Sequence, residues 1–524
     1  MSSNSEKRFR LIYDETLNQL RLISPYQNDL QPIIENFSCP NPAAFFVKQY
    51  GYNVPPTISI INSFGYFPVG MVYEVLKYIK TIYGSLSCIA CDSETLSVID
   101  RQMTPLKKHV KELSVDEFNV CNISKTLQLR DYQENIIKNL IFDGMGNGLF
   151  ESPTSSGKSF ILSNFIWTLH NKIDNAYKFL ILVPNRQLVD QFYKDMLEYG
   201  FEKSWLCRLA GGCKFTDSDL KKCKVIISNR QYLFSNKDKL PKIDVLICDE
   251  VHQIKSNSSS FELIQSINPR LKIGCSGTLP RDNYELWSLK GFFGKIIQSE
   301  NIVDLQKRGF ITQLNIQRIN VIDKSVDEDT RCLFSLNSTV KYSEDDNDVT
   351  FNAAWDAENN YITENFSRLY LPVLNKIQNL KGNILILFDR VKLGEDLFNL
   401  VKGKTSRKAF YIDGSTKIDD REDVRSAFEK SDNNILFAQS ATFSTGISIK
   451  NLPNIAFFFS GKAFSKVIQS IGRALRLHKN KDKATLIDVV FNFKYSRRHQ
   501  KERDKIYREI YNKNKVDNII DIIL

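Results

Sequence analysis

Hydrophobic and polar positions follow two different patterns along this chain. In residues 8–13 and 19–23 they alternate, as in strands buried on one face, and residues 71–79 are apolar at helical spacing. These patterns predict a small α+β domain. From about residue 125, short apolar runs are separated by helical patterns, which is typical of a parallel α/β sheet. The first four of these runs are residues 180–183, 225–227, 245–248 and 271–274.

A second α/β region follows farther along the chain. Between the two regions lies an acidic stretch, about residues 323–360, which we interpret as a solvated loop or insertion. Residues 494–515 hold nine Lys/Arg against three Asp/Glu and predict a docked basic helix. The apolar runs of this region are residues 384–388, 409–412, 434–438 and 455–459. The expected domains are residues 1–120, 121–310 and 311–524.

Composition narrows the class of protein only moderately. A net charge of +11 over 524 residues weakly favours a polyanionic partner. The ten cysteines are scattered, which fits reduced thiols, and the lone Cys88-x-x-Cys91 pair leaves metal binding and buried thiols both open. The first residues lack the apolar core of a signal peptide, and no run approaches the ~20 apolar residues of a membrane span. We therefore expect a soluble, cytoplasmic protein with no membrane partner.

Residues 152–159 carry the pattern on which the rest of the chain depends. They read Ser-Pro-Thr-Ser-Ser-Gly-Lys-Ser and lie between a short apolar run and an amphipathic one, so we expect strand, loop and helix. Such a loop closes its backbone N–H groups around phosphate oxygens, Lys158 reaches the β/γ-phosphates, and the Ser159 hydroxyl binds Mg²⁺. Ser152 replaces the first glycine of the strict pattern, so an ordinary turn is the alternative.

Polar residues that follow the later apolar runs supply the other candidate groups. Asp249 and Glu250 come directly after one run, where a carboxylate can hold Mg²⁺ through water and its neighbour can deprotonate water. Ser276 and Thr278 follow the next run, although Ser-Gly-Thr is also an ordinary turn. In a helix, Gln469, Arg473 and Arg476 would share one face and suit a phosphate being cleaved; a solvated basic face is the alternative.

Taken together and in order, these motifs resemble those of superfamily 2 helicases over residues 125–490. The resemblance implies two RecA-like parallel-sheet domains of the P-loop NTPase class, preceded by the small α+β domain. Within this superfamily, the chain resembles the UvsW-type branch-migration DNA helicases of phages. This resemblance rests on residues 443–452 and 469–476 and, less specifically, on residues 67–70. The matching stretches are residues 129–133, 152–159 (motif I), 183–188 (motif Ia), 227–231 (motif Ib), 249–252 (motif II), 276–278 (motif III), 388–390 (motif IV), 444–448 (motif V) and 469–476 (motif VI).

The resemblance also implies roles for individual residues around ATP and Mg²⁺. Lys158, Asp249 and Glu250 would be catalytic, together with Gln469, Arg473 and Arg476 from the second RecA-like domain. Ser159 and Asp249 would hold the metal, the aspartate through water. Ser276 and Thr278, with His252, would couple hydrolysis to domain closure. The nucleotide would contact Arg130, Gln133, Pro153, Thr154, Ser155, Ser156, Gly157, Lys158, Ser159 and Gly446.

The implied activity is ATP-dependent unwinding or translocation on branched or partly single-stranded DNA, with RNA–DNA hybrids as a further substrate. The implied activity includes branch migration, fork regression, and the unwinding of R-loops or D-loops. The basic residues of motifs Ia, Ib and V, with the N-terminal domain, would contact the DNA backbone. Three alternatives stay open from the sequence: an RNA helicase, a motor subunit of a restriction or repair complex, and a non-hydrolysing scaffold. Protein partners are unknown.

Overall fold

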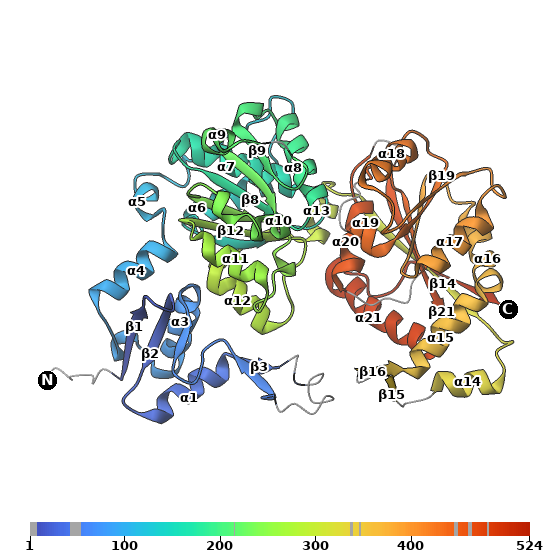
Figure 1. The fold of residues 1–524 in the computed structure, drawn as a ribbon, viewed down its shortest axis with the longest axis horizontal. Coiled ribbons are helices and arrows are strands. Elements are labelled where there is room, and N and C mark those ends of the chain that lie inside the picture. The colour runs from blue at the N-terminus through green and yellow to red at the C-terminus, as the bar shows by residue number, and fades with distance from the viewer. Residues whose placement is uncertain are drawn as a thin grey trace. The chain divides into compact units, whose positions relative to one another are not determined.

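Two compact units make up the described part of the chain. The computed structural model describes residues 8–41, 44, 54–213, 215–335, 339–344, 347–444, 449–458, 464–478 and 481–524. Residues 1–152 and 157–299 form the first unit, and residues 153–156 and 300–524 form the second. Figure 1 colours the first from blue to green and the second from yellow to red. No described helix is long and apolar enough to cross a bilayer.

The first unit begins with a small α+β domain around a four-stranded sheet of order β5-β2-β1-β6. β1 (Phe9–Asp14) pairs antiparallel with β2 (Gln19–Ile23) and parallel with β6 (Ile89–Cys91), as the alternating pattern predicted for the first two strands. The apolar face of α3 (Val72–Tyr83) packs on this sheet. The remaining elements are α1 (Gln27–Asn36), β3 (Ser38–Pro40), β4 (Thr57–Ser59), β5 (Tyr66–Pro68), α4 (Ser93–Met103) and α5 (Lys107–Val110).

A seven-stranded parallel sheet follows, with the order β13-β7-β12-β11-β8-β10-β9 in the described chain. Its central strands are apolar on both faces; all five side chains of β8 (Phe179–Val183) are at most 1% exposed. Burying one such side chain stabilises the fold by about 1.5–3 kcal/mol. The other strands are β7 (Gly148–Glu151), β9 (Leu206–Leu209), β10 (Val225–Asn229), β11 (Val245–Cys248), β12 (Leu271–Ser276) and β13 (Ile296–Ile297). The helices are α6 (Asp131–Phe142), α7 (Lys158–Lys172), α8 (Arg186–Tyr199), α9 (Asp217–Lys222), α10 (Arg230–Phe234), α11 (Ser259–Ile267) and α12 (Asn283–Phe293).

The N-terminal domain packs directly against α12 through two interlocking glycines. A Cβ atom on Gly70 would come within 2.4 Å of the Lys290 carbonyl oxygen, and one on Gly291 within 2.6 Å of Pro68 Cβ. The Lys290 ammonium pairs with Glu74 of α3 across the same contact. Because only glycine permits this backbone approach, the two sequence positions determine how closely the domain sits on α12.

The second unit is built around another seven-stranded parallel sheet, of order β18-β19-β17-β20-β21-β14-β22 in the described chain. The predicted class, two RecA-like sheets behind a small α+β domain, is therefore confirmed. The strands are β14 (Gln313–Ile322), β17 (Ile384–Phe388), β18 (Lys408–Ile412), β19 (Asn434–Gln439), β20 (Asn454–Phe457), β21 (Lys483–Phe491) and β22 (Asn518–Ile523). The helices of this sheet are α13 (Ile302–Lys307), α16 (Phe366–Ile377), α17 (Val391–Val401), α18 (Ile418–Glu429), α19 (Ser440–Ser444), α20 (Phe464–Ala474) and α21 (Lys494–Tyr511).

The acidic stretch between β14 and β17 is folded, and its interpretation as a solvated loop is wrong for two of its carboxylates. Asp323 and Glu358 are each 1% exposed. Asp323 receives two 2.8 Å hydrogen bonds from the Arg368 guanidinium, which hold its pKa low against the effect of burial. Glu358 accepts backbone N–H bonds from Tyr495 and Ser496, both at 2.7 Å, at the start of α21. The stretch contains α14 (Glu328–Ser335), β15 (Thr339–Glu344), β16 (Asn347–Asn352) and α15 (Ala353–Glu364), drawn together in Figure 1.

Candidate active site

The loop between β7 and α7 has the backbone geometry of a phosphate cradle. Ser155 and Gly157 both adopt left-handed conformations, with φ of 77° and 87°. A Cβ atom on Gly157 would lie 2.7 Å from Gln133 Nε2, so glycine is required here for space as well as for backbone angle. Gln133 is buried and accepts the Arg130 N–H through Oε1 at 3.0 Å, which closes a capping box at the start of α6. The structure therefore places Gln133 beside the loop, and its contact with the nucleotide stays a prediction.

Neighbouring strands deliver the other candidate groups to the same edge of the sheet. β7, β12 and β11 are adjacent, and the loop, Ser276 and Asp249 follow their carboxyl ends. The Ser152 N–H donates to the Ser276 carbonyl at 2.8 Å. Lys158 Nζ donates to the Ser152 carbonyl at 3.2 Å and lies 3.9 Å from Glu250 Oε1. Lys158 thus lies between the loop and Glu250, about ninety residues farther along the chain, while Ser276 contacts the same loop through its carbonyl.

The two motif II carboxylates have opposite protonation tendencies. Asp249 is 5% exposed, and burial together with the neighbouring Glu250 raises its pKa to about 6. Burial also pushes the pKa of Glu250 upward, but the Lys158 ammonium and the His252 ring outweigh it and hold that pKa below its usual range. Glu250 is therefore ionised at neutral pH and can accept a hydrogen bond from water. Its backbone adopts a left-handed conformation, with φ of 50°.

Ser276 links Glu250 to the loop that follows β12. Its Oγ lies 2.7 Å from His252 Nδ1 and 3.3 Å from Glu250 Oε2. The same hydroxyl lies 2.7 Å from the Thr278 carbonyl and accepts the Thr278 N–H at 3.1 Å. The three residues predicted to couple hydrolysis to movement are thus in one hydrogen-bonded network with the candidate general base.

Arg230 has a different position from the one that sequence reasoning assigned to motif Ib. It was expected to contact DNA, but it is only 7% exposed and its Nη2 donates to the carbonyls of Asp249 and Glu250, at 3.3 and 3.1 Å. The correction has a simple cause: α10 begins at Arg230 directly after β10, so the side chain turns beneath the end of β11. No local sequence signal distinguishes such a buried arginine from an exposed one. Arg186 of motif Ia is exposed.

Two further contacts at the site were not predicted. Ser159 Oγ lies 3.0 Å from the Tyr199 hydroxyl at the end of α8. Cys275 Sγ donates to Asp249 Oδ1 at 3.3 Å, and burial raises the pKa of this thiol well above its usual value. Both partners were invisible in the sequence because Tyr199 and Cys275 match no motif. They hold the two candidate metal ligands in place.

In the second unit, motif VI forms α20. The Arg473 guanidinium carbon lies 5.3 Å from the centroid of the Phe443 ring. Arg476 follows the helix, and its carbonyl accepts the Thr312 hydroxyl at 3.0 Å. Buried Lys481, which the sequence did not single out, donates to the Ala474 carbonyl at 2.7 Å and so satisfies the end of α20. Gly446 of motif V and the side chain of Gln469 lie outside what the structure describes, and the arginine roles stay predictions.

The residues of the first unit fit a magnesium–nucleotide group. Mg²⁺ requires oxygen ligands, which the Ser159 hydroxyl and the buried Asp249 carboxylate can supply. The phosphates require a cation, which Lys158 can supply. Among the described residues, no group of three or more His, Cys, Asp and Glu side chains is arranged to hold a metal by itself. Cys88 and Cys91 are half-buried free thiols.

Comparison with known families decides what this site belongs to. Residues 126–281 match the family model described as "Type III restriction enzyme, res subunit", and residues 368–478 match "Helicase conserved C-terminal domain". The chain belongs to the superfamily 2 helicases. The membership predicted from the motifs is confirmed, and the protein is an ATP-dependent helicase.

Individual relatives of this helicase cover most of its length. It is 26% identical over 432 residues to the "ATP-dependent DNA helicase uvsW" of Enterobacteria phage T4, which covers 81% of this chain and 79% of the relative. Two solved structures share its fold. Dbp5 of S. cerevisiae, bound to RNA and ADP BeF3, has a TM-score of 0.52 at 15% identity and covers 80% of this helicase and 93% of Dbp5. The Type ISP restriction-modification enzyme LlaBIII, bound to DNA, has a TM-score of 0.56 at 14% identity. This match covers 83% of this helicase and 33% of LlaBIII.

Proposed function

We propose that this helicase works on DNA and that its substrates are branched: junctions in branch migration, stalled forks, and R-loops or D-loops in phage-type recombination and repair. The observation that carries the proposal is the similarity to the DNA helicase of phage T4, which extends over 81% of the chain. That relative is described as a DNA helicase, and the match spans most of both chains.

The proposed chemistry follows from the geometry of the site. Lys158 would bind the β/γ-phosphates, while Ser159 and Asp249 would hold Mg²⁺, the aspartate through water. When Mg²⁺ is bound, it neutralises negative charge on the phosphates. Glu250, ionised and held between Lys158 and His252, would take the proton from the attacking water. Arg473 and Arg476, together with Gln469, would stabilise the charge that develops on the phosphate.

Coupling of hydrolysis to movement would run through β12 and α12. Ser276 contacts Glu250 at the end of β12, and the chain continues from there into α12. Gly291 and Lys290 of α12 carry the N-terminal domain through the contacts with Pro68 and Glu74. A shift of the Ser276 network on phosphate release would therefore be passed to that domain by packed elements.

The exposed face of α21 supports a nucleic-acid partner. Lys494, Arg498, Lys501, Lys505 and Arg508 are all exposed and follow one another at spacings of four and three residues, so they form a single row. The row extends for about 21 Å at 1.5 Å per residue. Of these five, Lys505 pairs with Glu502 at 2.9 Å. A straight row of cations fits a phosphodiester backbone.

Neutralising part of this row should weaken DNA binding in a salt-dependent manner. Each phosphate contact contributes about 0.9 to the slope of log affinity against log salt on duplex DNA, so Arg498→Ala/Lys501→Ala/Lys505→Ala should lower the slope by about 2–3. Fluorescence anisotropy between 50 and 200 mM NaCl measures it. The matched control, Lys402→Ala/Lys404→Ala/Lys430→Ala, removes three exposed lysines of the same unit and should leave the slope unchanged. Equal slopes for both variants would exclude α21 as a DNA contact.

The substrate itself is tested by the nucleic acid that stimulates ATP hydrolysis. We expect a four-way junction or fork to raise the steady-state rate most, duplex DNA less, and RNA alone least. Stimulation by RNA only would overturn the DNA proposal in favour of an RNA helicase. The restriction-enzyme description of the first family model favours a second candidate, a motor subunit of a restriction or repair complex. That candidate predicts stimulation by plain duplex DNA without preference for branches.

A further inference from the structure

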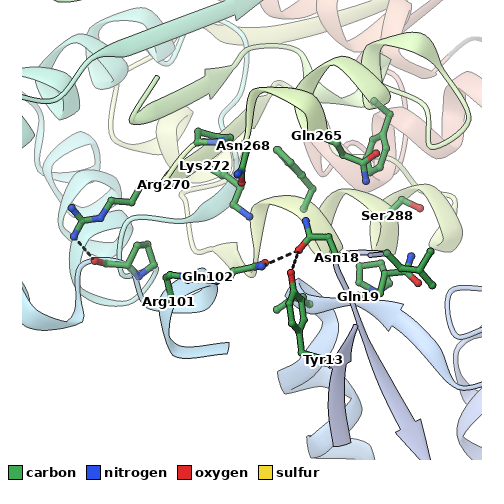
Figure 2. A pocket seen from close by; sticks show the side chains of 18 of the residues that line it. Tyr13, Asn18, Gln19, Arg101, Gln102, Gln265, Asn268, Arg270, Lys272 and Ser288 are labelled. Carbon is green, nitrogen blue, oxygen red and sulfur yellow. Dashed lines mark hydrogen bonds between the residues drawn. The ribbon is translucent and has the colours of Figure 1, made fainter. Parts of the chain in front are cut away.

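A large cleft separates the N-terminal domain from the first parallel sheet. It encloses about 1550 Å³ and lies within the first unit. Its sheet side is formed by residues that precede β11 and β12, such as Asp244 and Arg270. The candidate active site follows the other ends of the same two strands. The cleft, whose lining is drawn in Figure 2, is therefore a separate site at the opposite edge of the sheet.

Lys272 is the residue that makes this cleft unusual. It is the only charged side chain of β12, an inner strand whose other residues are buried. Its ammonium lies 5.0 Å from the centroid of the Phe292 ring, and it has no ion pair or side-chain hydrogen bond with any residue the structure describes. Burial lowers its pKa to about 8, so it remains a cation at neutral pH. A cation held here without an anion costs stability, which indicates a role other than packing.

A second donor is pre-oriented toward the same space. Asn18 Oδ1 accepts hydrogen bonds from the Tyr13 hydroxyl at 2.8 Å and from Gln102 Nε2 at 3.0 Å. Both bonds use the oxygen of the amide, so its Nδ2 is left to donate. Figure 2 shows Asn18, Gln102 and Lys272 around the same part of the cleft. Lys272 and Asn18 thus both present donors to the cleft.

The charge of the lining is also unbalanced. Six basic and three acidic side chains line the cleft. Asp100 is paired with Lys107 at 2.6 Å, and Asp244 accepts the Lys178 N–H at 2.9 Å, so two of the acids already have partners. Arg101, Lys108 and Lys242 are exposed at the rim and have no ion pair among the described side chains. The surplus is positive.

We propose that this cleft binds a single strand of nucleic acid, several nucleotides long. Lys272, Asn18 and the rim bases would contact phosphate oxygens, while amides and half-buried tyrosines such as Tyr66 would contact bases, whose edges and faces a duplex hides. The volume exceeds that of a typical small-molecule pocket, about 300–1000 Å³, and suits a polymer. The inference rests on the proposed action on nucleic acid. On a branched substrate it would hold a displaced strand away from the motor.

Lys272→Met and Arg101→Ala/Lys108→Ala/Lys242→Ala test the proposal in the full chain. Binding of a fluorescein-labelled dT₁₂ strand is measured by anisotropy between 50 and 200 mM NaCl. We expect Lys272→Met to weaken binding about tenfold, and the triple variant to lower the salt slope by about 2, at about 0.7 per contact on single strands. Lys203→Ala, which removes an exposed lysine of the same unit outside the cleft lining, should bind as the unaltered protein does.

The thermal midpoint separates a binding role from a structural one. Removing an unpaired, half-buried cation should raise the Tm of Lys272→Met by about 2 °C or more, even as binding weakens. Unchanged dT₁₂ affinity in both variants, or weaker binding accompanied by a lower Tm, would overturn the proposal. A photo-crosslinker at Asn268 should capture dT₁₂; preferential capture of duplex would overturn the single-strand assignment. In both variants, ATP hydrolysis measured without nucleic acid should be unaffected. Binding of rU₁₂ is compared with that of dT₁₂: a preference for rU₁₂ would contradict the proposed action on DNA but not the binding of a single strand in the cleft.

Discussion

Glu250→Gln should reduce ATP hydrolysis by about 10²–10⁴-fold, the range that a general base contributes. Glu250 is held ionised at neutral pH by Lys158, 3.9 Å away, and by His252, 3.3 Å away, although burial opposes its charge. Glutamine preserves the shape and can still accept a hydrogen bond from water, but it cannot take a proton. The loss should therefore fall on kcat, while nucleotide affinity changes little. Steady-state hydrolysis and binding of a fluorescent ATP analogue measure the two quantities separately.

Glu262→Gln provides the matched control for this substitution. Glu262 is an exposed glutamate of α11 in the same unit, so the same chemical change there should leave both quantities within twofold. Hydrolysis that survives in Glu250→Gln would mean that another group activates water. The assignment of motif II as the catalytic centre would then fail, and with it the role given to the Ser276 network.

Asp488→Asn should lower the free energy of unfolding of the second unit by about 3–5 kcal/mol, the cost of leaving a buried charge unpaired. Asp488 on β21 is fully buried and accepts Arg503 Nε of α21 at 2.9 Å and Arg318 Nη2 of β14 at 3.1 Å. Arg318 keeps a second partner in Asp504, whereas Arg503 is 0% exposed and forms an ion pair with Asp488. The thermal transition of this unit should fall by about 10 °C, measured by differential scanning calorimetry.

Two further variants distinguish charge from packing in this network. Asp482→Asn alters an exposed aspartate just before β21 and should change stability by less than about 0.5 kcal/mol. Asp488→Leu/Arg503→Met removes both charges and should recover much of the loss, since apolar residues of similar size can replace a buried ion pair. A double variant no more stable than Asp488→Asn would show that hydrogen-bond geometry, rather than an uncompensated charge, accounts for the effect.

Most strands and the motif order could be predicted from the sequence, because both are local. An apolar run such as residues 180–183 is buried whatever its neighbours in the fold are. A loop that ends in Gly-Lys-Ser after such a strand indicates a phosphate-binding site. β22 escaped prediction: residues 518–523 form an edge strand that pairs with β14, and four of its six residues remain exposed. The three-part domain division stays a prediction.

Buried charges could not be predicted, because their partners come from distant parts of the chain. Arg230 and Glu358 read as an exposed DNA contact and a solvated acid; they instead hold motif II and the start of α21. Burial raises the pKa of Glu358 to about 7, an effect that depends on its surroundings rather than on its neighbours in sequence. Burying a polar side chain costs free energy unless a hydrogen-bond or ion-pair partner compensates for the lost hydration. The local sequence pattern does not indicate whether such a partner is present.

The sequence by itself determined the class of this protein: two parallel α/β domains, one phosphate loop, and a motif set that identifies a superfamily 2 helicase. The tertiary structure alone decided which of these pieces meet. The order β7-β12-β11 brings Ser152, Ser276 and Glu250 together at one edge, and the opposite ends of the same strands form a cationic cleft against the N-terminal domain. The reason is that strand order results from how the crossover helices pack, a long-range balance of burial that no stretch of residues encodes locally.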